Sequence, residues 1–228
     1  MLPNLSRLSG CTSADLASPT DDSAAMELMY ATADGELADV ERLIQEGVDV
    51  NERDQNGESA LVWAAKHGHI NVMRILIKAG ANVNIKSNSG RTALIEAVLR
   101  HNYFAVRELL KANADVDIKD NEGMTALMYV CAIKEEHAGI VIALLNANAN
   151  VDLQDDDLGY TALMQAVKNR HFETVKILVD RKANVNIVSR LGRTALEMAS
   201  DDGLAYRRQH GSTNPHKRIM NVLLEAGA

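Results

Sequence analysis

A short motif, Ser/Thr-Ala-Leu, returns at a nearly constant interval along this chain of 228 residues. Successive copies begin 33, 33, 36 and 33 residues apart, at Ser59, Thr92, Thr125, Thr161 and Thr194. A fixed period near 33 residues is typical of a solenoid, in which each unit buries its apolar face only by stacking against its neighbours. The period therefore predicts one elongated array rather than one or two globular domains.

Each unit is predicted to contain three parts. A turn with a glycine at its tip comes first, and a fixed glycine there indicates a backbone φ above zero. A short helix follows, opened by the Ser or Thr of the motif, whose hydroxyl can accept a hydrogen bond from an amide two or three residues on. A longer second helix ends in an apolar pair. The tip glycines are Gly57, Gly90, Gly123, Gly159 and Gly192, and the apolar pairs are Leu76-Ile77, Leu109-Leu110, Leu144-Leu145, Leu178-Val179 and Leu223-Leu224.

The residue after each second helix gives an independent check on these boundaries. Glycine and asparagine adopt the left-handed conformation that ends a helix at the lowest cost. Five of the six units have glycine or asparagine there: Gly47, Gly80, Asn113, Asn148 and Gly227. The remaining unit, 152–185, has Lys182. We expect a left-handed backbone at all six positions.

The array is predicted to occupy residues 20–228, after a flexible leader over 1–19 that shows no apolar periodicity. Its first unit has no preceding hairpin and is expected to be the N-terminal cap. The approximate units are 20–50, 51–83, 84–116, 117–151, 152–185 and 186–228. The first helix of the cap is expected to bury Met26, Met29, Tyr30 and Ala33, and its second helix, about 36–45, to bury Leu37, Val40, Leu43 and Ile44.

Two units are longer than the period. The fourth carries two extra residues near 133–137 and one more within 154–159. The last carries about twelve extra residues, an insertion over 201–216 between its two helices. Asn214-Pro215 suggests an N-cap followed by proline at the first helical position, so the second helix is expected to restart there.

Taken together, the glycine turn, Thr-x-Leu, the two helices, the apolar pair and a closing Gly-Ala-x-Val-Asn resemble the ankyrin repeat. The resemblance covers residues 20–228 in six units. It implies an all-α ankyrin-repeat solenoid of stacked antiparallel helix pairs with projecting β-hairpin turns. It also implies binding of other proteins, usually on the concave face formed by the hairpins and first helices. Ankyrin hairpin asparagines are hydroxylated in some animal cells, and Asn51, Asn84 and Asn186 match that position.

Composition and motifs favour a non-enzymatic protein without a cofactor or metal site. A net charge of −7 disfavours nucleic-acid binding, and no apolar run near twenty residues predicts membrane insertion. His67 and His69 are assigned to the junction of two helices, and 155–157 to a solvated hairpin, rather than to metal sites. No phosphate loop, zinc cluster or nucleophile elbow occurs in the sequence.

Cysteine usage bears on the compartment. Cys11 and Cys131 lack metal or redox spacing, and residues 1–17 lack the apolar stretch of a secretory signal. These features favour a cytoplasmic or otherwise intracellular protein, in its own cell or in a host cell that receives it.

The residues beside the tip glycines and on the outward side of the first helices have no role in defining the repeat, so a protein partner is expected there. Apolar residues are unusual in surface turns, and aromatic, Met and Arg side chains are enriched at interface centres. An open alternative is that Trp63 and Tyr129 only fill space between neighbouring first helices. The expected contact residues are Trp63, Arg91, Met124, Tyr129, Leu158, Tyr160, Arg190, Leu191 and Arg193.

The basic residues of the insertion provide a second candidate contact. Arg207, Arg208, Lys217 and Arg218 indicate either a solvated loop or a contact for an acidic or phosphorylated partner. Two functions therefore stay open: a binding module that uses its concave face, and a regulatory or inhibitory subunit or host-directed effector that contacts an enzyme through 201–216. The last helix lacks the polar outer face of a terminal cap, which predicts self-association or further chain beyond it.

Overall fold

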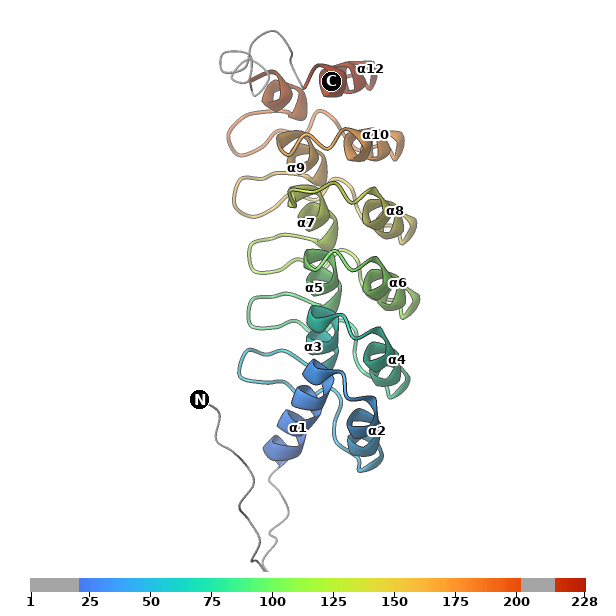
Figure 1. The fold of residues 1–228 in the computed structure, drawn as a ribbon. Helices are drawn as coiled ribbons and strands as arrows, with labels where there is room; N and C mark the ends of the chain where they lie inside the picture. Colours follow the sequence, from blue (N-terminus) through green and yellow to red (C-terminus); the bar gives the residue numbers. More distant parts are fainter. Residues whose placement is uncertain (1–20, 202–215) are drawn as a thin grey trace, which may run out of the picture.

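Helix pairs stack in one row along the chain, as the ribbon in Figure 1 shows. The structure, a computed structural model, describes residues 21–201 and 216–228. The predicted leader and most of the predicted insertion, including Arg207 and Arg208, lie outside the described residues.

The helices form an inner and an outer row. Each helix contacts its own partner and the equivalent helix of the next pair, and the hairpins project from the inner row (Figure 1). The inner helices are α1 (Asp21–Asp34), α3 (Ala60–His67), α5 (Ala93–Leu99), α7 (Ala126–Ala132) and α9 (Ala162–Lys168), followed by helical residues 195–201. The outer helices are α2 (Leu37–Gln45), α4 (Ile70–Lys78), α6 (Tyr103–Lys111), α8 (Ala138–Asn146), α10 (Phe172–Asp180) and α12 (Lys217–Glu225). The predicted all-α solenoid is confirmed.

Threonine caps the inner helices as predicted. The hydroxyls of Thr92, Thr125 and Thr161 accept hydrogen bonds from the amides three residues on, at 3.3–3.4 Å. Ser59 departs from the prediction, because its buried hydroxyl has no hydrogen-bond partner. The second helix of the last unit begins at Lys217 with His216 at its N-cap, two residues later than Asn214-Pro215 predicted.

The core runs the length of the stack between the two rows. The first residue of every predicted apolar pair is fully buried: Leu76, Leu109, Leu144, Leu178 and Leu223. The motif leucines Leu61, Leu94, Leu127 and Leu163 are equally buried on the inner helices. Because each unit covers the apolar face of the one before it, the core is continuous and needs few aromatic residues.

The buried face of α1 is rotated from the one predicted. Tyr30 is 59% exposed, while Ala25, Leu28, Met29 and Thr32 face the core. These four residues follow the i, i+3, i+4, i+7 spacing, one residue out of step with the predicted set, and one residue is a rotation of about 100° on a helix. In α2, Val40 and Leu43 are buried as predicted, but Leu37 at the first position of the helix is exposed.

Hydrogen bonds between hairpins supplement the helix contacts. At the tips, backbone amides donate to carbonyls of the preceding hairpin at 2.8–3.1 Å: Asn88 to Asn56, Asn121 to Ser89, Asp156 to Glu122 and Arg190 to Leu158. At the bases, side-chain oxygens accept from amides of the next unit at 2.6–2.9 Å: Asn51 from Asn82, Asn84 from Asp115, Asp117 from Asn150 and Asp152 from Asn184. Within residues 21–201 and 216–228 the hairpins form no extended strand, and one isolated antiparallel bridge joins Arg53 and Ser59.

The predicted left-handed residues all have positive φ, including Lys182 at 68°. Two further residues, His101 and Arg170, share this conformation at the ends of first helices, where Gly35 and Gly68 stand in other units.

None of the described helices combines the length and apolarity that crossing a membrane requires.

Lys182 provides a test of the strain that a left-handed backbone imposes on a residue with a Cβ. A left-handed backbone costs a residue with a Cβ about 1 kcal/mol, so Lys182→Gly is expected to raise the free energy of unfolding by ~1 kcal/mol. Thermal and urea unfolding of the variant and the parent measure the difference. Lys182→Ala removes the same charge but keeps the Cβ, and it should not be stabilising; a gain equal to that of glycine would assign the effect to charge.

Candidate protein-binding surface

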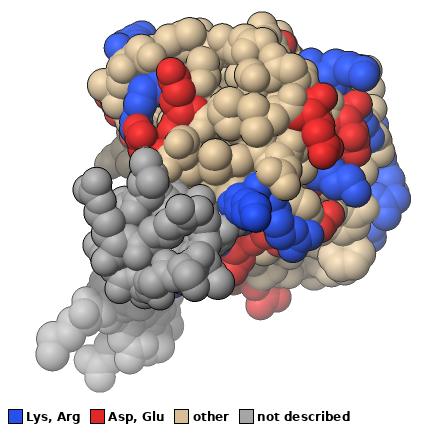
Figure 2. Space-filling model, turned by 90° about the horizontal axis from the view of Figure 1, so that it is seen from above, with Lys and Arg blue, Asp and Glu red and all other residues tan. Residues whose placement is uncertain are grey.

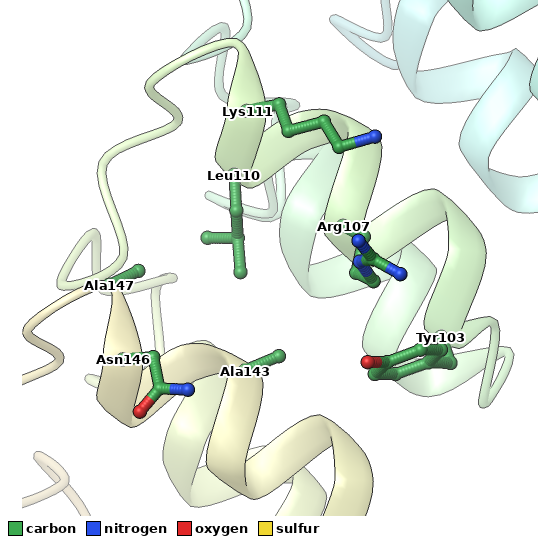
Figure 3. Close-up of a pocket in the computed structure, with 7 residues that line it drawn as sticks. All are labelled: Tyr103, Arg107, Leu110, Lys111, Ala143, Asn146 and Ala147. Atoms are coloured by element: carbon green, nitrogen blue, oxygen red, sulfur yellow. The ribbon is translucent and has the colours of Figure 1, made fainter.

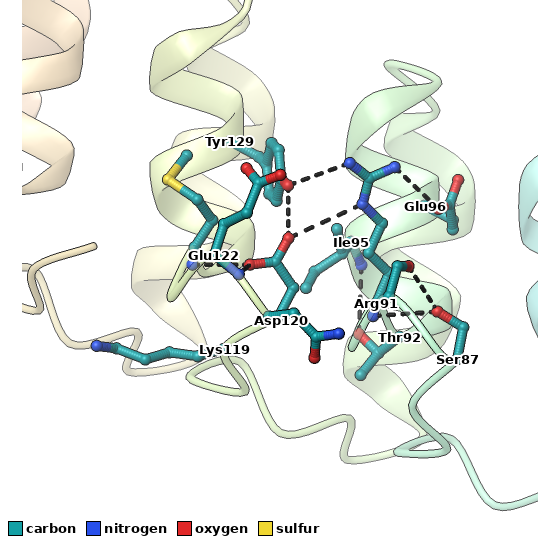
Figure 4. Close-up of polar contacts among 12 residues, drawn as sticks. Ser87, Arg91, Thr92, Ile95, Glu96, Lys119, Asp120, Glu122 and Tyr129 are labelled. Atoms are coloured by element: carbon teal, nitrogen blue, oxygen red, sulfur yellow. Dashed lines mark hydrogen bonds and ion pairs between the residues drawn. The ribbon is translucent and has the colours of Figure 1, made fainter. Parts of the chain in front are cut away.

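The hairpins and the exposed side of the inner helices meet along one side of the stack, which we call the hairpin face. It comprises 54–58, 87–91, 120–124, 155–160 and 189–193 with the inner-helix residues beside them. A polar network joins successive units there (Figure 4). The Nη2 atom of Arg91 donates to the hydroxyl of Tyr129 at 3.3 Å, and its guanidinium lies 3.8 Å from Glu96 and 3.9 Å from Asp120. Arg91 thus connects two neighbouring units.

Asp120 organises this network from the base of its hairpin. One carboxylate oxygen accepts from the amides of Glu122 and Met124, each at 2.9 Å, and the other accepts from the hydroxyl of Tyr129 at 2.6 Å. Burial, with the hydrogen bond to Asp120, raises the pKa of Tyr129 to about 12. Tyr129 therefore remains a donor at neutral pH, and one carboxylate fixes both the turn and the side chain of the inner helix.

The same arrangement recurs in two other units. Asp54 accepts from two amides of its own turn and from Trp63 Nε1 at 3.2 Å; Asp155 accepts from two amides of its turn and from Gln165 Nε2 at 3.4 Å. Asp155 is therefore buried and bonded, not solvated as the sequence suggested. The signal available in the sequence was an acidic residue five positions before the motif at 54 and 120, and six before it in the longer turn at 155.

Three of the predicted contact residues are not accessible. Met124, Tyr129 and Tyr160 are 8%, 9% and 4% exposed and belong to the core cluster. The expectation that their positions have no structural role is wrong, because Met124 and Tyr160 follow tip glycines of closely stacked hairpins and Tyr129 on α7 bonds Asp120. For Tyr129 the space-filling alternative therefore describes its place in the fold.

The other predicted residues lie on the hairpin face with graded exposure. Leu191 is 58% exposed and Arg190 is exposed, while Arg91, Arg193 and Leu158 are half-buried. Trp63 is also half-buried, with its indole stacked on His67 at 5.8 Å. The accessible part of the predicted surface thus lies mainly at the hairpin of the last unit.

Cations on this face are held in position by acceptors or rings. Lys66 pairs with Glu58 at 2.8 Å, Arg193 with Asp201 at 3.2 Å, and Lys168 lies 5.7 Å from the ring centre of Tyr160. The hydroxyl of Tyr160 also raises the pKa of Arg193, as Tyr129 pairs with Arg91 in an earlier unit. Such contacts restrict the side chains before any partner binds.

The model of the family described as ankyrin repeats (3 copies) matches residues 28–120, 102–189 and 130–228, which together span most of the chain. The chain belongs to the ankyrin-repeat family. A search of the curated proteins gave no match. A solved structure contains a chain similar to this one: the predatory endopeptidase Bd0816 from Bdellovibrio bacteriovorus in complex with the immunity protein Bd3460. The similarity has a TM-score of 0.71 and 27% identity, and it covers 87% of this chain and 97% of that chain.

The described basic residues near the predicted insertion lie on the outer row of the ankyrin array. Lys217 and Arg218 are exposed in the first turn of α12, and the Arg218 guanidinium lies 3.8 Å from the ring centre of Phe172 on α10. Arg218 therefore has a packing role between two outer helices. Arg207 and Arg208 lie outside the described residues, so the contact predicted for them stays a prediction.

A shallow groove of about 590 Å³ runs between α6 and α8 on the outer row (Figure 3). It is lined by Tyr103, Arg107, Leu110, Lys111, Ala143, Asn146 and Ala147. Phe104 beside Tyr103 is 68% exposed. The sequence prediction did not include these residues, because it placed the partner on the hairpins and the inner helices.

The α12 end of the ankyrin array shows a broad area without charged side chains, bordered by charged residues of both signs (Figure 2). Leu224, the second residue of the last apolar pair, is 54% exposed on α12. The predicted self-association or further chain at this end stays a prediction.

Proposed function

We propose that this ankyrin array is a non-enzymatic protein-binding module that holds its partner against the hairpin face. The observation that supports it is the set of partly exposed cations on that face, Lys66, Arg91, Lys168 and Arg193, each held by neighbouring groups. A cation that is already ordered loses less side-chain entropy when it binds a carboxylate, so its net contribution to affinity is larger. The proposed partner is a protein that presents acidic groups around an apolar contact to Leu191.

Two substitutions that each replace an exposed apolar residue by glutamate test whether the partner binds the hairpin face or the outer row. Leu191→Glu places a charge on the hairpin face, and Phe104→Glu places one on the outer row; both side chains are exposed, at 58% and 68%. Once the partner has been captured by affinity pull-down with the parent protein, we expect Leu191→Glu to weaken its binding about tenfold, or ~1.4 kcal/mol, since charge is disfavoured at an apolar interface centre. Phe104→Glu should bind as the parent does, and both variants should melt like the parent. Binding lost only in Phe104→Glu would move the interface to the outer row.

A second candidate is inhibition of a peptidase. It is favoured by the similarity to a chain of a solved complex between an endopeptidase and an immunity protein, over nearly the full length of both chains. If the captured partner is a peptidase, its activity on a peptide substrate should fall as this protein is added. Deleting 202–215 then distinguishes inhibition through the hairpin face from inhibition through the insertion. Retained inhibition supports the hairpin face, and lost inhibition with an unchanged melting temperature supports contact through the insertion.

A further inference from the structure

Histidine recurs at the N-cap positions of the outer helices, and at two of them its side chain makes the same type of hydrogen bond. His69 and His171 stand directly before α4 and α10, and their Nε2 atoms hydrogen-bond carbonyls of the preceding unit, Ala33 at 2.8 Å and Lys134 at 3.2 Å. Asn102 caps α6 with its side chain. At two of these positions the histidine therefore ties the end of one inner helix to the next unit.

His137 occupies the same position before α8 but makes no such bond. Its Nε2 atom is shielded from solvent and has no hydrogen-bond partner. A buried ring nitrogen is normally satisfied by protein, water or an ion. The imidazole of His137 instead stacks on that of His101, with ring centres 4.3 Å apart.

The longer connection of the fourth unit brings a carboxylate to this histidine pair. Residues 133–137 separate α7 from α8, whereas only 100–102 separate α5 from α6. Glu135 from the longer segment lies 4.0 Å from His101 Nε2, and its side chain is 71% exposed. The carboxylate of the neighbouring Glu136 does not join this group, because it accepts a hydrogen bond from the amide of Thr174 at 2.6 Å.

We propose that His101, Glu135 and His137 form a surface site for a divalent transition metal of the zinc type, which would join the third unit to the fourth. One ligand atom from each residue lies within 4.8 Å of the other two. Ligand atoms around a tetrahedral zinc ion are ~3.3–3.6 Å apart, given bond lengths of about 2.0–2.2 Å, so the exposed Glu135 and His101 side chains must rotate inward to close the site. Two imidazoles and one carboxylate suit Zn²⁺, Ni²⁺ or Cu²⁺, not Ca²⁺ or Mg²⁺, which prefer oxygen ligands alone.

Imidazole binds a metal ion in its neutral form. The three residues leave at least one coordination position open on the solvent side, for water or for a side chain of a partner. A ligand supplied by a partner would make binding on this part of the outer row dependent on the metal.

Calorimetric titration of the chelator-stripped full chain with Zn²⁺ tests the proposal. A Cys11→Ser background removes the one cysteine outside the described residues, and Cys131 is buried, which raises the pKa of its thiol. We expect one Zn²⁺ per chain and a melting temperature that rises with the Zn²⁺ concentration. Co²⁺ in place of Zn²⁺ should give the visible absorption bands of a bound ion.

His101→Asn is the decisive variant, because asparagine tolerates the left-handed backbone at this position, where φ is 56°. It should weaken Zn²⁺ binding about tenfold or more, as should Glu135→Gln, with the melting temperature of the metal-free protein unchanged. His67→Asn, which changes an exposed histidine outside the group, should bind Zn²⁺ as the parent does. Absence of Zn²⁺ binding by the parent, or equal binding by His101→Asn, would overturn the proposal.

Discussion

Gly123→Ala is expected to lower the free energy of unfolding by about 3 kcal/mol, although glycine to alanine is a small change. Two costs add. Gly123 has a φ of +76°, where a Cβ costs ~1 kcal/mol or more. The added Cβ would also lie 2.5 Å from the backbone nitrogen of Asp156 in the next hairpin, which is too close for any real contact. Because the tips are joined by the hydrogen bond from Asp156 to Glu122, the hairpins cannot separate without losing it.

Gly192→Ala separates the two costs. Gly192 is the equivalent tip in the last unit, with a φ of +72°, and a Cβ there would meet no atom within 4 Å. It should therefore lose only the backbone part, ~1 kcal/mol. Urea unfolding of both variants measures the difference, which reports the close packing of hairpin on hairpin. Equal losses would show that the tips are not packed as described.

Asp120→Ala is expected to destabilise the fold by about 3 kcal/mol. It removes the acceptor of three hydrogen bonds and leaves the amides of Glu122 and Met124 and the hydroxyl of Tyr129 without it. It also removes a carboxylate that faces the guanidinium of Arg91. Because the turn and the inner helix share this acceptor, both should loosen, and amide exchange over 120–124 should accelerate.

Tyr129→Phe is the matched control, since it removes only one of these hydrogen bonds and should cost ~1 kcal/mol. It also gives a test against pH. The folded-state pKa of Tyr129, about 12, lies above its usual value of 10, so the protonated form is favoured by folding. Its contribution is complete below pH 10 and is lost as the pH rises toward 12, a loss that the phenylalanine variant should not share. A full ~3 kcal/mol loss in Tyr129→Phe would place the energy in the hydroxyl of Tyr129 instead of in the hydrogen bonds from the turn amides to Asp120.

Most of the fold could be predicted from the sequence because its determinants repeat. Thr92 and its equivalents mark the start of each inner helix, and the leucine pairs mark the end of each outer helix. Even Lys182 could be placed in the left-handed region, because five other units carry glycine or asparagine at that position. A residue type that recurs at the same position of each unit indicates that this position has the same environment in each unit.

The hairpin face was harder to predict, since its residues differ from unit to unit. Tyr160 looked exposed because it follows a turn glycine, but the next hairpin covers it, and that contact depends on packing between units. The role of Asp120 was hidden for the same reason, because its partner Tyr129 is a tryptophan or a glutamine in other units. His101 was missed as a left-handed residue because glycine occupies that position in only some units.

Hydrogen–deuterium exchange of the protein, free and bound to its captured partner, tests the central claim most directly. Binding on the hairpin face should slow amide exchange over 189–193, 87–91 and the inner helices beside them, and leave α6 and α8 on the outer row unchanged. Slower exchange confined to α6 and α8, with the hairpins exchanging as in the free protein, would contradict the account.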